Sequence, residues 1–217
     1  MPFPAALSPE QQEEAARLYR SGLSAQQVAN QFHVSLDATF YALRHLKVQR
    51  RTPQETNRIR FEAKSLSYDL KKKLTLREER LKYAAVLLYW AEGYKVGHTG
   101  LDFANSDPDM ALIFRKFLAE VCRIDENRLR ASLYCYEGQN IQAITNFWSK
   151  FLNIPKKQFT KPYIKRAEKT SSRGPRMVNG LVHIRYCDKK LLRQVLKWIE
   201  EYCQECVGGG VVNRTTL

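Results

Sequence analysis

Long apolar runs are missing from this sequence of 217 residues. No stretch approaches the ~18 consecutive apolar residues that a membrane-spanning helix needs. The N-terminal stretch MPFPAALSPEQQ also lacks the basic region followed by an apolar region that marks a secretory signal. We therefore expect a protein that neither spans a membrane nor is exported.

Cysteine is scarce, with five residues scattered along the chain. An odd, scattered set indicates a reducing compartment rather than a disulfide framework. Cys203 and Cys206 have the one spacing typical of a metal site, but a structural zinc ion needs four ligands and no second close pair exists. The favoured interpretation is a pair of reduced thiols at a helix end.

Acidic residues are also in deficit, with 22 Asp and Glu against 36 Lys and Arg, a formal net charge of +14. The corresponding pI is about 9.7. Such a surface attracts polyanions, of which nucleic acid is the commonest. An anionic membrane would require a strongly amphipathic basic helix, and the sequence contains no convincing one. We expect double-stranded DNA as the partner, no membrane and no small-molecule substrate.

Capping motifs mark a series of helices at the start of the chain. The tetrapeptides SPEQ (8–11) and SAQQ (24–27) are capping boxes, so they predict two helices, the second of them short. The tripeptide HVS (33–35) predicts a tight turn. Its serine can cap a third helix that runs to about Leu46.

The order helix, short helix, tight turn, helix is that of a tri-helical helix-turn-helix. The stretch LSAQQVANQFHVSLDATFYALRHL resembles this motif in bacterial regulators and recombinases, through the small Ala29, the turn and the inward Leu43. His33 stands where that family usually has a glycine in the left-handed conformation, which histidine tolerates better than most residues. We expect a DNA-binding domain over residues 1–51.

The resemblance implies that the third helix enters the major groove. We expect Val34, Thr39, Ala42 and Leu43 to face inward. The outward residues, candidates for DNA contact, are then Ser35, Leu36, Asp37, Phe40, Tyr41 and Arg44. The alternative is a three-helix module that contacts protein. Arg50 and Arg51 follow directly, together with Lys47, and they favour DNA.

Residues 52–74 are expected to form a basic helical linker. The capping box TPQE (52–55) opens a helix that carries Ile59, Phe61, Leu66 and Leu70 among lysines and arginines. These charges suit either a solvated face or contact with phosphates.

The capping box TLRE (75–78) opens a helix that becomes almost wholly apolar from Leu81 to Trp90. A helix that is apolar on nearly every side must lie centrally or at a subunit interface. Gly93 is predicted to be its left-handed C-cap. Glu92, directly before it, places a carboxylate at the negative pole of the helix.

The stretch AVLLYWAEG (85–93) resembles the LAGLIDADG helix of homing endonucleases, in which an apolar helix ends in a small residue, an acid and glycine. Ala91, Glu92 and Gly93 match these positions, whereas Leu87 stands where the family often has glycine. The resemblance implies that two such helices pair and that the acids bind a catalytic divalent metal. With one motif per chain, pairing requires a homodimer. The alternative is a surface glutamate.

Alternating residues predict strands over 128–136 and 182–186, each with one apolar face. The other face carries Arg128, Arg130, Tyr134 and Arg185, which suits either a platform on DNA or an ordinary half-exposed antiparallel sheet. Residues 156–176 predict a mobile, phosphate-binding loop that includes Lys165, Arg166, Arg173 and Arg176.

The expected fold class is therefore α+β: a helix-turn-helix, a helical linker, a mixed αββα LAGLIDADG-like domain with an antiparallel sheet over 75–206, and a disordered tail over 207–217. The stretches LYWAEGYK (88–95), FANSDP (103–108) and FWSKFLNIP (147–155) together resemble a bacterial group that joins these two domains. We expect a cytoplasmic, nucleoid-associated, homodimeric DNA-binding regulator. The alternative is a Mg²⁺-dependent endonuclease in which Glu92 of two subunits binds metal and Lys95 or Lys165 lies near the scissile phosphate.

Overall fold

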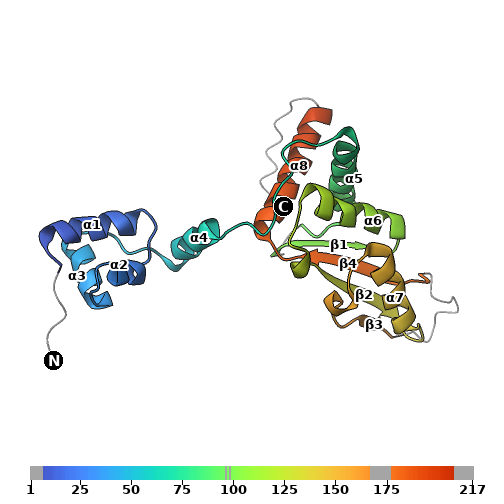
Figure 1. The fold of residues 1–217 in the computed structure, drawn as a ribbon, viewed down its shortest axis with the longest axis horizontal. Helices are drawn as coiled ribbons and strands as arrows, with labels where there is room; N and C mark the ends of the chain where they lie inside the picture. Colours follow the sequence, from blue (N-terminus) through green and yellow to red (C-terminus); the bar gives the residue numbers. More distant parts are fainter. Residues whose placement is uncertain (1–6, 96, 98, 167–176, 208–217) are drawn as a thin grey trace. The chain divides into compact units, whose positions relative to one another are not determined.

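The computed structural model describes residues 7–95, 97, 99–166 and 177–207. Over these residues the chain is a mixed α+β protein with eight α-helices and four strands, so the expected α+β class is confirmed (Figure 1). It divides into two compact units, residues 1–65 and residues 66–217, called here the first and the second unit.

The first unit consists of α1 (Pro9–Arg20), α2 (Ala25–Gln31), α3 (Leu36–His45) and α4 (Pro53–Ala63). Ser8, Ser24, Ser35 and Thr52 cap these helices with their side-chain oxygens, as their positions predict. The first three helices bury a small apolar core, which is formed by Leu7, Ala15, Ala16, Tyr19, Ala25, Val28, Ala42 and Leu43.

The turn between α2 and α3 has the geometry expected from the sequence. His33 adopts a left-handed conformation with φ 53°, which is rare for a residue other than glycine. The backbone amide of Val34 then donates to the carbonyl of Ala29 at 3.0 Å, which closes the turn. Ser35 Oγ accepts from the amide of Ala38 and starts α3.

The helix expected to carry Leu66 and Leu70 is shorter than predicted, because α4 ends at Ala63. The segment that begins at Leu66 belongs to the second unit and packs on the rest of it. The amides of Asp69 and Lys71 donate to the carbonyls of Cys122 and Val121, at 3.2 and 3.0 Å. Tyr68, Leu70 and Leu74 also pack against the second unit's core. These distant partners require a non-helical backbone here.

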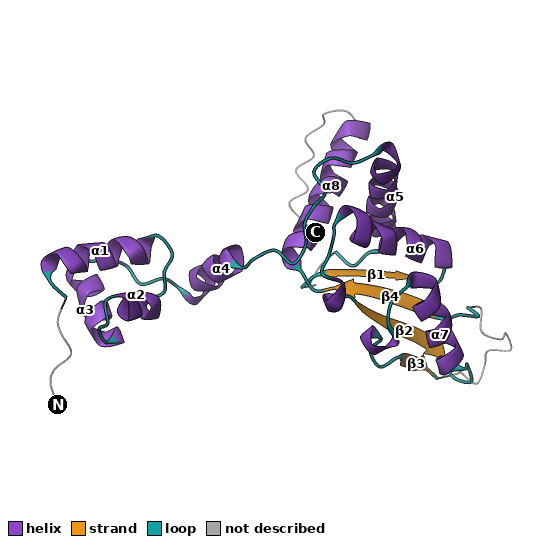
Figure 2. Cartoon of the chain, in the orientation of Figure 1, coloured by secondary structure: helices purple, strands orange, loops and turns teal. Residues whose placement is uncertain are grey.

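The second unit alternates helices with short strands (Figure 2). Its elements in chain order are α5 (Leu76–Glu92), β1 (Leu101–Asn105), α6 (Pro108–Lys116), a π-helical turn η1 (Phe117–Val121), a 3₁₀ turn η2 (Glu126–Arg128), β2 (Arg130–Tyr136), α7 (Ile141–Leu152), a 3₁₀ turn η3 (Lys156–Gln158), β3 (Tyr163–Lys165), β4 (Leu181–Tyr186) and α8 (Lys189–Val207).

The four strands form one sheet in the order β1-β4-β2-β3. β4 pairs antiparallel with both β1 and β2. β3 pairs with β2 in parallel, so the expected antiparallel sheet is wrong for this strand. The reason is the connection: α7 lies between β2 and β3, and such a crossover returns the chain in its original direction.

One face of the sheet is covered by helices and the other is open (Figure 1). Phe103 of β1 stacks on Phe114 of α6 with ring centroids 4.5 Å apart, and Tyr89 of α5 stacks on the same ring at 5.6 Å. The buried strand residues alternate, as the pleat requires. They are Leu101, Phe103, Ala131, Leu133, Cys135, Val182, Ile184 and Tyr186.

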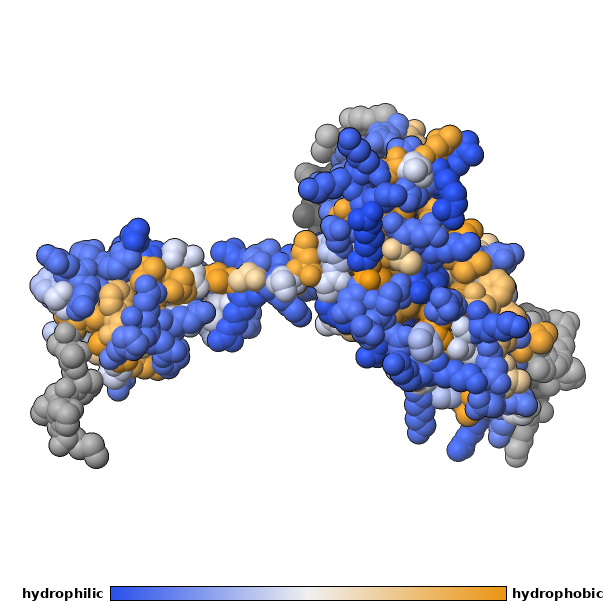
Figure 3. Space-filling view, viewed as in Figure 1, coloured by the Kyte–Doolittle hydropathy of each residue, from blue (hydrophilic) through white to orange (hydrophobic). Residues whose placement is uncertain are grey.

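Hydrophilic residues cover most of the visible surface of the second unit, and hydrophobic residues gather over α6 (Figure 3). In the part of the chain that the structure describes, no helix is both long and apolar enough to cross a membrane.

The aromatic contact at Phe114 predicts a local stability measurement. All three tryptophans lie in the second unit, so tryptophan fluorescence reports on the unfolding of that unit. Phe114→Ala should lower its free energy of unfolding by about 3–5 kcal/mol, through lost burial and a cavity. Val178→Ala, at a side chain that is 81% exposed, should change it by less than about 0.5 kcal/mol. Equal effects would contradict this description of the core.

Candidate nucleic-acid interface

The outward face of α3 is the first candidate surface. Thr39, Ala42 and Leu43 are buried, as expected, so they hold the helix against α1 and α2. Four of the predicted contact residues, Leu36, Asp37, Tyr41 and Arg44, are exposed. Tyr41 is 61% exposed, and its ring stacks on His45 with centroids 6.2 Å apart.

Phe40 and Ser35 contribute to this surface differently from the other predicted residues. Phe40 is partly buried against the core of the first unit. The guanidinium of Arg50 lies over its ring at 4.1 Å, an arrangement that holds this cation beside α3. Ser35 uses its hydroxyl as the N-cap. The surface that remains for a partner is Leu36, Asp37, Tyr41 and Arg44, with Arg50 at its border.

Arg51 has a structural role that the sequence does not indicate. Its guanidinium donates to the carbonyls of Tyr19, Gly22 and Leu23. It also lies over the Tyr19 ring at 4.0 Å, and its backbone amide donates to the Tyr19 hydroxyl at 3.1 Å. These contacts cap the end of α1 and use three of the five guanidinium N–H donors. Arg51 is therefore a clamp within the first unit.

The open face of the sheet is the second candidate surface. Cross-strand pairing places Asp102, Arg185 and Arg130 in one row, and Ala104, His183 and Ser132 in the next. Further along, Tyr134 lies between Leu181 and Tyr163, and Tyr136 lies beside Lys165. This open face therefore combines cations with aromatic rings. It is defined by Asp102, Ala104, Arg130, Ser132, Tyr134, Tyr136, Tyr163, Lys165, Leu181, His183 and Arg185.

A buried carboxylate lies within this basic surface. Asp102 is 5% exposed. Its Oδ1 is 2.8 Å from His183 Nδ1, and its Oδ2 accepts from Arg185 Nε at 2.8 Å. Burial alone would raise the pKa of Asp102, but the hydrogen bonds and charges of His183 and Arg185 outweigh it and hold the pKa below its usual value. Asp102 therefore remains ionised at neutral pH.

Tyrosine rings also lie on the open face. Tyr134 packs against Tyr163 with centroids 4.9 Å apart and meets Tyr136 edge-on at 6.0 Å. Tyr94, which follows α5, stacks on His183 at 6.1 Å. Asp102 and Tyr94 were not among the predicted site residues. Asp102 could have been found, because it alternates with Leu101 and Phe103 and must face away from the core.

Two of the predicted arginines have backbone partners. Arg128 lies in η2, before β2 begins, and donates to the carbonyl of Cys187 at 2.7 Å while it lies over the Tyr186 ring. Arg130 Nη1 donates to the carbonyls of Asn127 and Leu129, at 2.6 and 2.7 Å. Both add positive charge to this side of the sheet. Their orientation is determined by the protein backbone.

Glu92 is the last residue of α5 and is exposed. Gly93 does not adopt the predicted left-handed conformation, because it is extended, with φ −84° and ψ 147°. It forms a bridge with Phe103 at the edge of β1. Glycine is required for close approach, since a Cβ here would lie 2.5 Å from the carbonyl oxygen of Tyr89. The helix thus ends by joining the sheet edge.

The proposed catalytic residues do not all come together within one chain. Glu92 and Lys95 flank the β1 edge, whereas Lys165 belongs to β3 at the opposite edge. Three strand spacings separate β1 from β3, roughly 14 Å at ~4.8 Å each. Among the described residues, no group of three or more His, Cys, Asp or Glu could hold a metal ion. Glu92 alone does not form a Mg²⁺ site, which needs more oxygen ligands.

The structure describes the basic segment 156–176 as far as Arg166. It contains η3 and β3, and Lys165 lies beside Tyr136 on the open face. Arg166 follows β3 and is exposed. Arg173 and Arg176 lie outside the described residues, as does the C-terminal segment 208–217 that was expected to be disordered.

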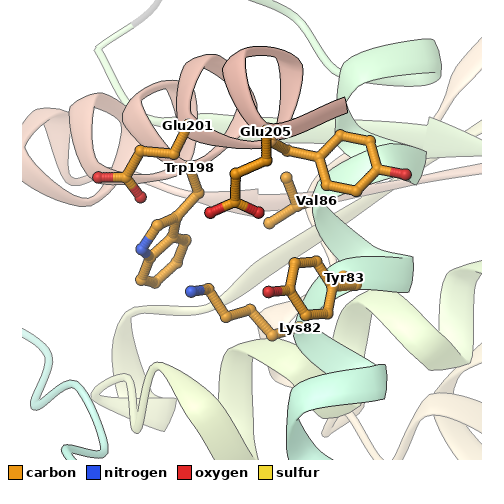
Figure 4. Close-up of a pocket in the computed structure, with 7 residues that line it drawn as sticks. Lys82, Tyr83, Val86, Trp198, Glu201 and Glu205 are labelled. Atoms are coloured by element: carbon orange, nitrogen blue, oxygen red, sulfur yellow. The ribbon is translucent and has the colours of Figure 1, made fainter. Parts of the chain in front are cut away.

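A small hollow between α5 and α8 is lined by side chains of the two helices (Figure 4). Lys82 Nζ points toward Trp198 and lies 4.5 Å from its ring centroid, and Glu201 and Glu205 project from α8 nearby. This cation–π contact joins the two helices. Cys203 and Cys206, further along α8, form no disulfide.

Two surfaces, the outward face of α3 and the open face of the sheet, therefore remain as candidate interfaces. No protein-family model, curated protein or solved structure matches this chain.

The clamp at Arg51 predicts a loss of stability. Arg51→Ala should lower the free energy of unfolding of the first unit by about 2–4 kcal/mol, because three carbonyls lose charged donors. Circular dichroism during thermal unfolding would measure it, with tryptophan fluorescence as the internal reference for the second unit. Arg44→Ala, at an exposed position of α3, is the matched control and should leave the transition unchanged. The idea fails if Arg51→Ala unfolds like the wild type.

Proposed function

We propose that this protein binds double-stranded DNA, with α1–α3 acting as a helix-turn-helix and the open face of the sheet acting as a second contact surface. One observation carries the proposal: each unit leaves one face of a packed element open, and that face presents cations and aromatic side chains. α3 presents Tyr41 and Arg44, and the sheet presents Arg185, Lys165 and the tyrosines. The net charge of +14 supports the same partner.

A helix-turn-helix assignment agrees with the local geometry of the first unit. α2 and α3 are joined by a tight turn at His33, and the recognition helix of this motif presents the residues of its first turns to the major groove. Leu36 and Tyr41 offer apolar contacts for thymine methyl groups, and Arg44 offers donors for a base or a phosphate.

We propose a regulatory role in preference to cleavage. A LAGLIDADG-like nuclease would need a carboxylate at the foot of α5 from each of two chains, together with Mg²⁺. Glu92 is exposed and so is available to a second chain. However, Lys165 of the same chain lies at the opposite edge of the sheet, so one chain does not bring Glu92 and Lys165 together. Binding without cleavage requires none of these groups.

Self-association through α5 completes the proposal. Tyr83, Leu87 and Trp90 are exposed at intervals of four and three residues, so they form one apolar stripe along the helix. A stripe of this kind marks an interaction site. A second copy of α5 would cover it in a two-fold dimer, in the manner of paired LAGLIDADG helices.

Salt dependence tests the binding proposal. The full chain should bind a genomic fragment library, and its affinity should fall by about 10³-fold or more between 50 and 200 mM salt if six or more phosphates are contacted. Arg44→Ala should weaken binding roughly ten-fold. Arg17→Ala, which removes an exposed arginine paired with Glu14 on α1, should leave the affinity unchanged. Fluorescence anisotropy measures both.

The same mixtures, incubated with Mg²⁺ and with EDTA, separate regulator from nuclease. Intact DNA under both conditions is expected. Mg²⁺-dependent breaks that disappear in Glu92→Gln would instead establish the endonuclease. Salt-independent binding, or none at all, would refute the DNA-binding proposal itself.

Sedimentation velocity tests the dimer. Trp90→Asp should convert the wild-type dimer to a monomer at micromolar concentration, because it places a charge in an apolar contact. Val178→Asp introduces the same charge at an exposed position away from α5 and should remain dimeric. A wild-type chain that sediments as a monomer on DNA and off it would refute pairing through α5.

A further inference from the structure

Arg185 is held differently from the other arginines of the open face. Its Nε donates to Asp102 Oδ2 at 2.8 Å. Its side chain is 44% exposed, and within the described residues Nη1 and Nη2 have no hydrogen-bond partner. One edge of the guanidinium is therefore bound to the protein, while the pair of Nη donors is available to a ligand.

Asp102 holds that guanidinium in one orientation. The carboxylate is buried, and each of its oxygens already has a partner, with His183 on Oδ1 and Arg185 on Oδ2. Tyr94 stacks on the ring of His183. The backbone of Asp102 is also fixed, because it pairs with Arg185 in the β1–β4 ladder. Neither partner can rotate without breaking a charged hydrogen bond.

A carboxylate is not expected on a surface whose only role is to attract phosphates. A negative charge on a DNA-binding face weakens the non-specific attraction that lysines and arginines supply. What the carboxylate provides in return is orientation: it fixes the plane and direction of a side chain that would otherwise be flexible. Fixed orientation matters for reading bases, because sequence is read by hydrogen bonds to base edges, whereas phosphate contacts carry no sequence information.

We propose that Arg185 is a base-reading residue of the open face, specific for guanine, and that Asp102 is its positioning residue. The inference rests on the proposed DNA-binding function. Nη1 and Nη2 form a planar donor pair that matches the O6 and N7 acceptors of guanine in the major groove, the commonest specific contact of arginine. Arg185 lies on β4, between β1 and β2, and is therefore placed within the open face and not at its edge. Arg130, opposite it, is turned toward backbone carbonyls.

Selection of sites from a randomised duplex library by the full chain tests this inference. The wild type should prefer guanine at one position by roughly 5- to 150-fold, the range expected for one bidentate pair. Arg185→Lys keeps the charge but not the donor pair, so that preference should fall at least five-fold while affinity for random duplex and the salt dependence stay unchanged. Asp102→Asn should lose the same preference.

Arg77→Lys is the matched control, because Arg77 is paired with Glu120 on the helical side of the second unit. It should select the same sites as the wild type. The tryptophan unfolding midpoint identifies any variant that is merely unfolded, and Arg185→Lys, at an exposed position, decides the matter if Asp102→Asn does not fold.

Three results would overturn the inference. In the first, the wild type and Arg185→Lys select the same sites. In the second, the wild type binds duplex in a salt-dependent way but shows no base preference. In the third, the wild type binds no duplex. The first two leave the proposed DNA-binding function standing. The third refutes that function as well.

Discussion

The packing of α6 against the sheet is the interaction on which the second unit depends. Phe114 contacts Phe103 of β1 and Tyr89 of α5, so one ring joins the sheet to two helices. Because side chains alternate across a strand, burying Phe103 turns Asp102 to the other face. Burial of Ile184 in the same way turns His183 and Arg185 to the open face, beside Asp102. The position of Asp102, His183 and Arg185 on the open face is thus a consequence of the apolar packing on the opposite face of the sheet.

Net charge gives an incomplete account of what this protein offers to a partner. Several cations have internal roles: Arg51 caps the end of α1, Arg128 holds the Cys187 carbonyl and Lys82 joins two helices. Such groups still contribute to the long-range field that attracts a polyanion. Local recognition depends on the smaller set whose donors point outward. Arg44 on α3 and Arg185 on β4 belong to that set, and the second of them is oriented by an acid.

The candidate site could be predicted from sequence only in part. The outward set on α3 follows from helical periodicity and a cap, so Leu36, Tyr41 and Arg44 were found correctly as exposed residues. The alternation of β2 and β4 likewise identified the face that carries Arg185. Arg51 was predicted to contact DNA because it follows a basic run. Its structural role could not be predicted, because its partners Tyr19, Gly22 and Leu23 are close to it only after folding. Lys165 was grouped with Glu92 by charge, and sheet order separates them.

The sequence by itself determined the local features: the N-caps at Ser8, Ser24, Ser35, Thr52 and Thr75, the left-handed turn at His33, and the faces of β2 and β4. Each depends on residues a few positions apart, whose geometry is the same in any fold. Tertiary structure alone decided that β3 runs parallel to β2, that Gly93 joins the sheet edge and that Asp102 is shared by His183 and Arg185. These features join residues distant in the chain, and packing brings such residues together in ways that no local pattern encodes.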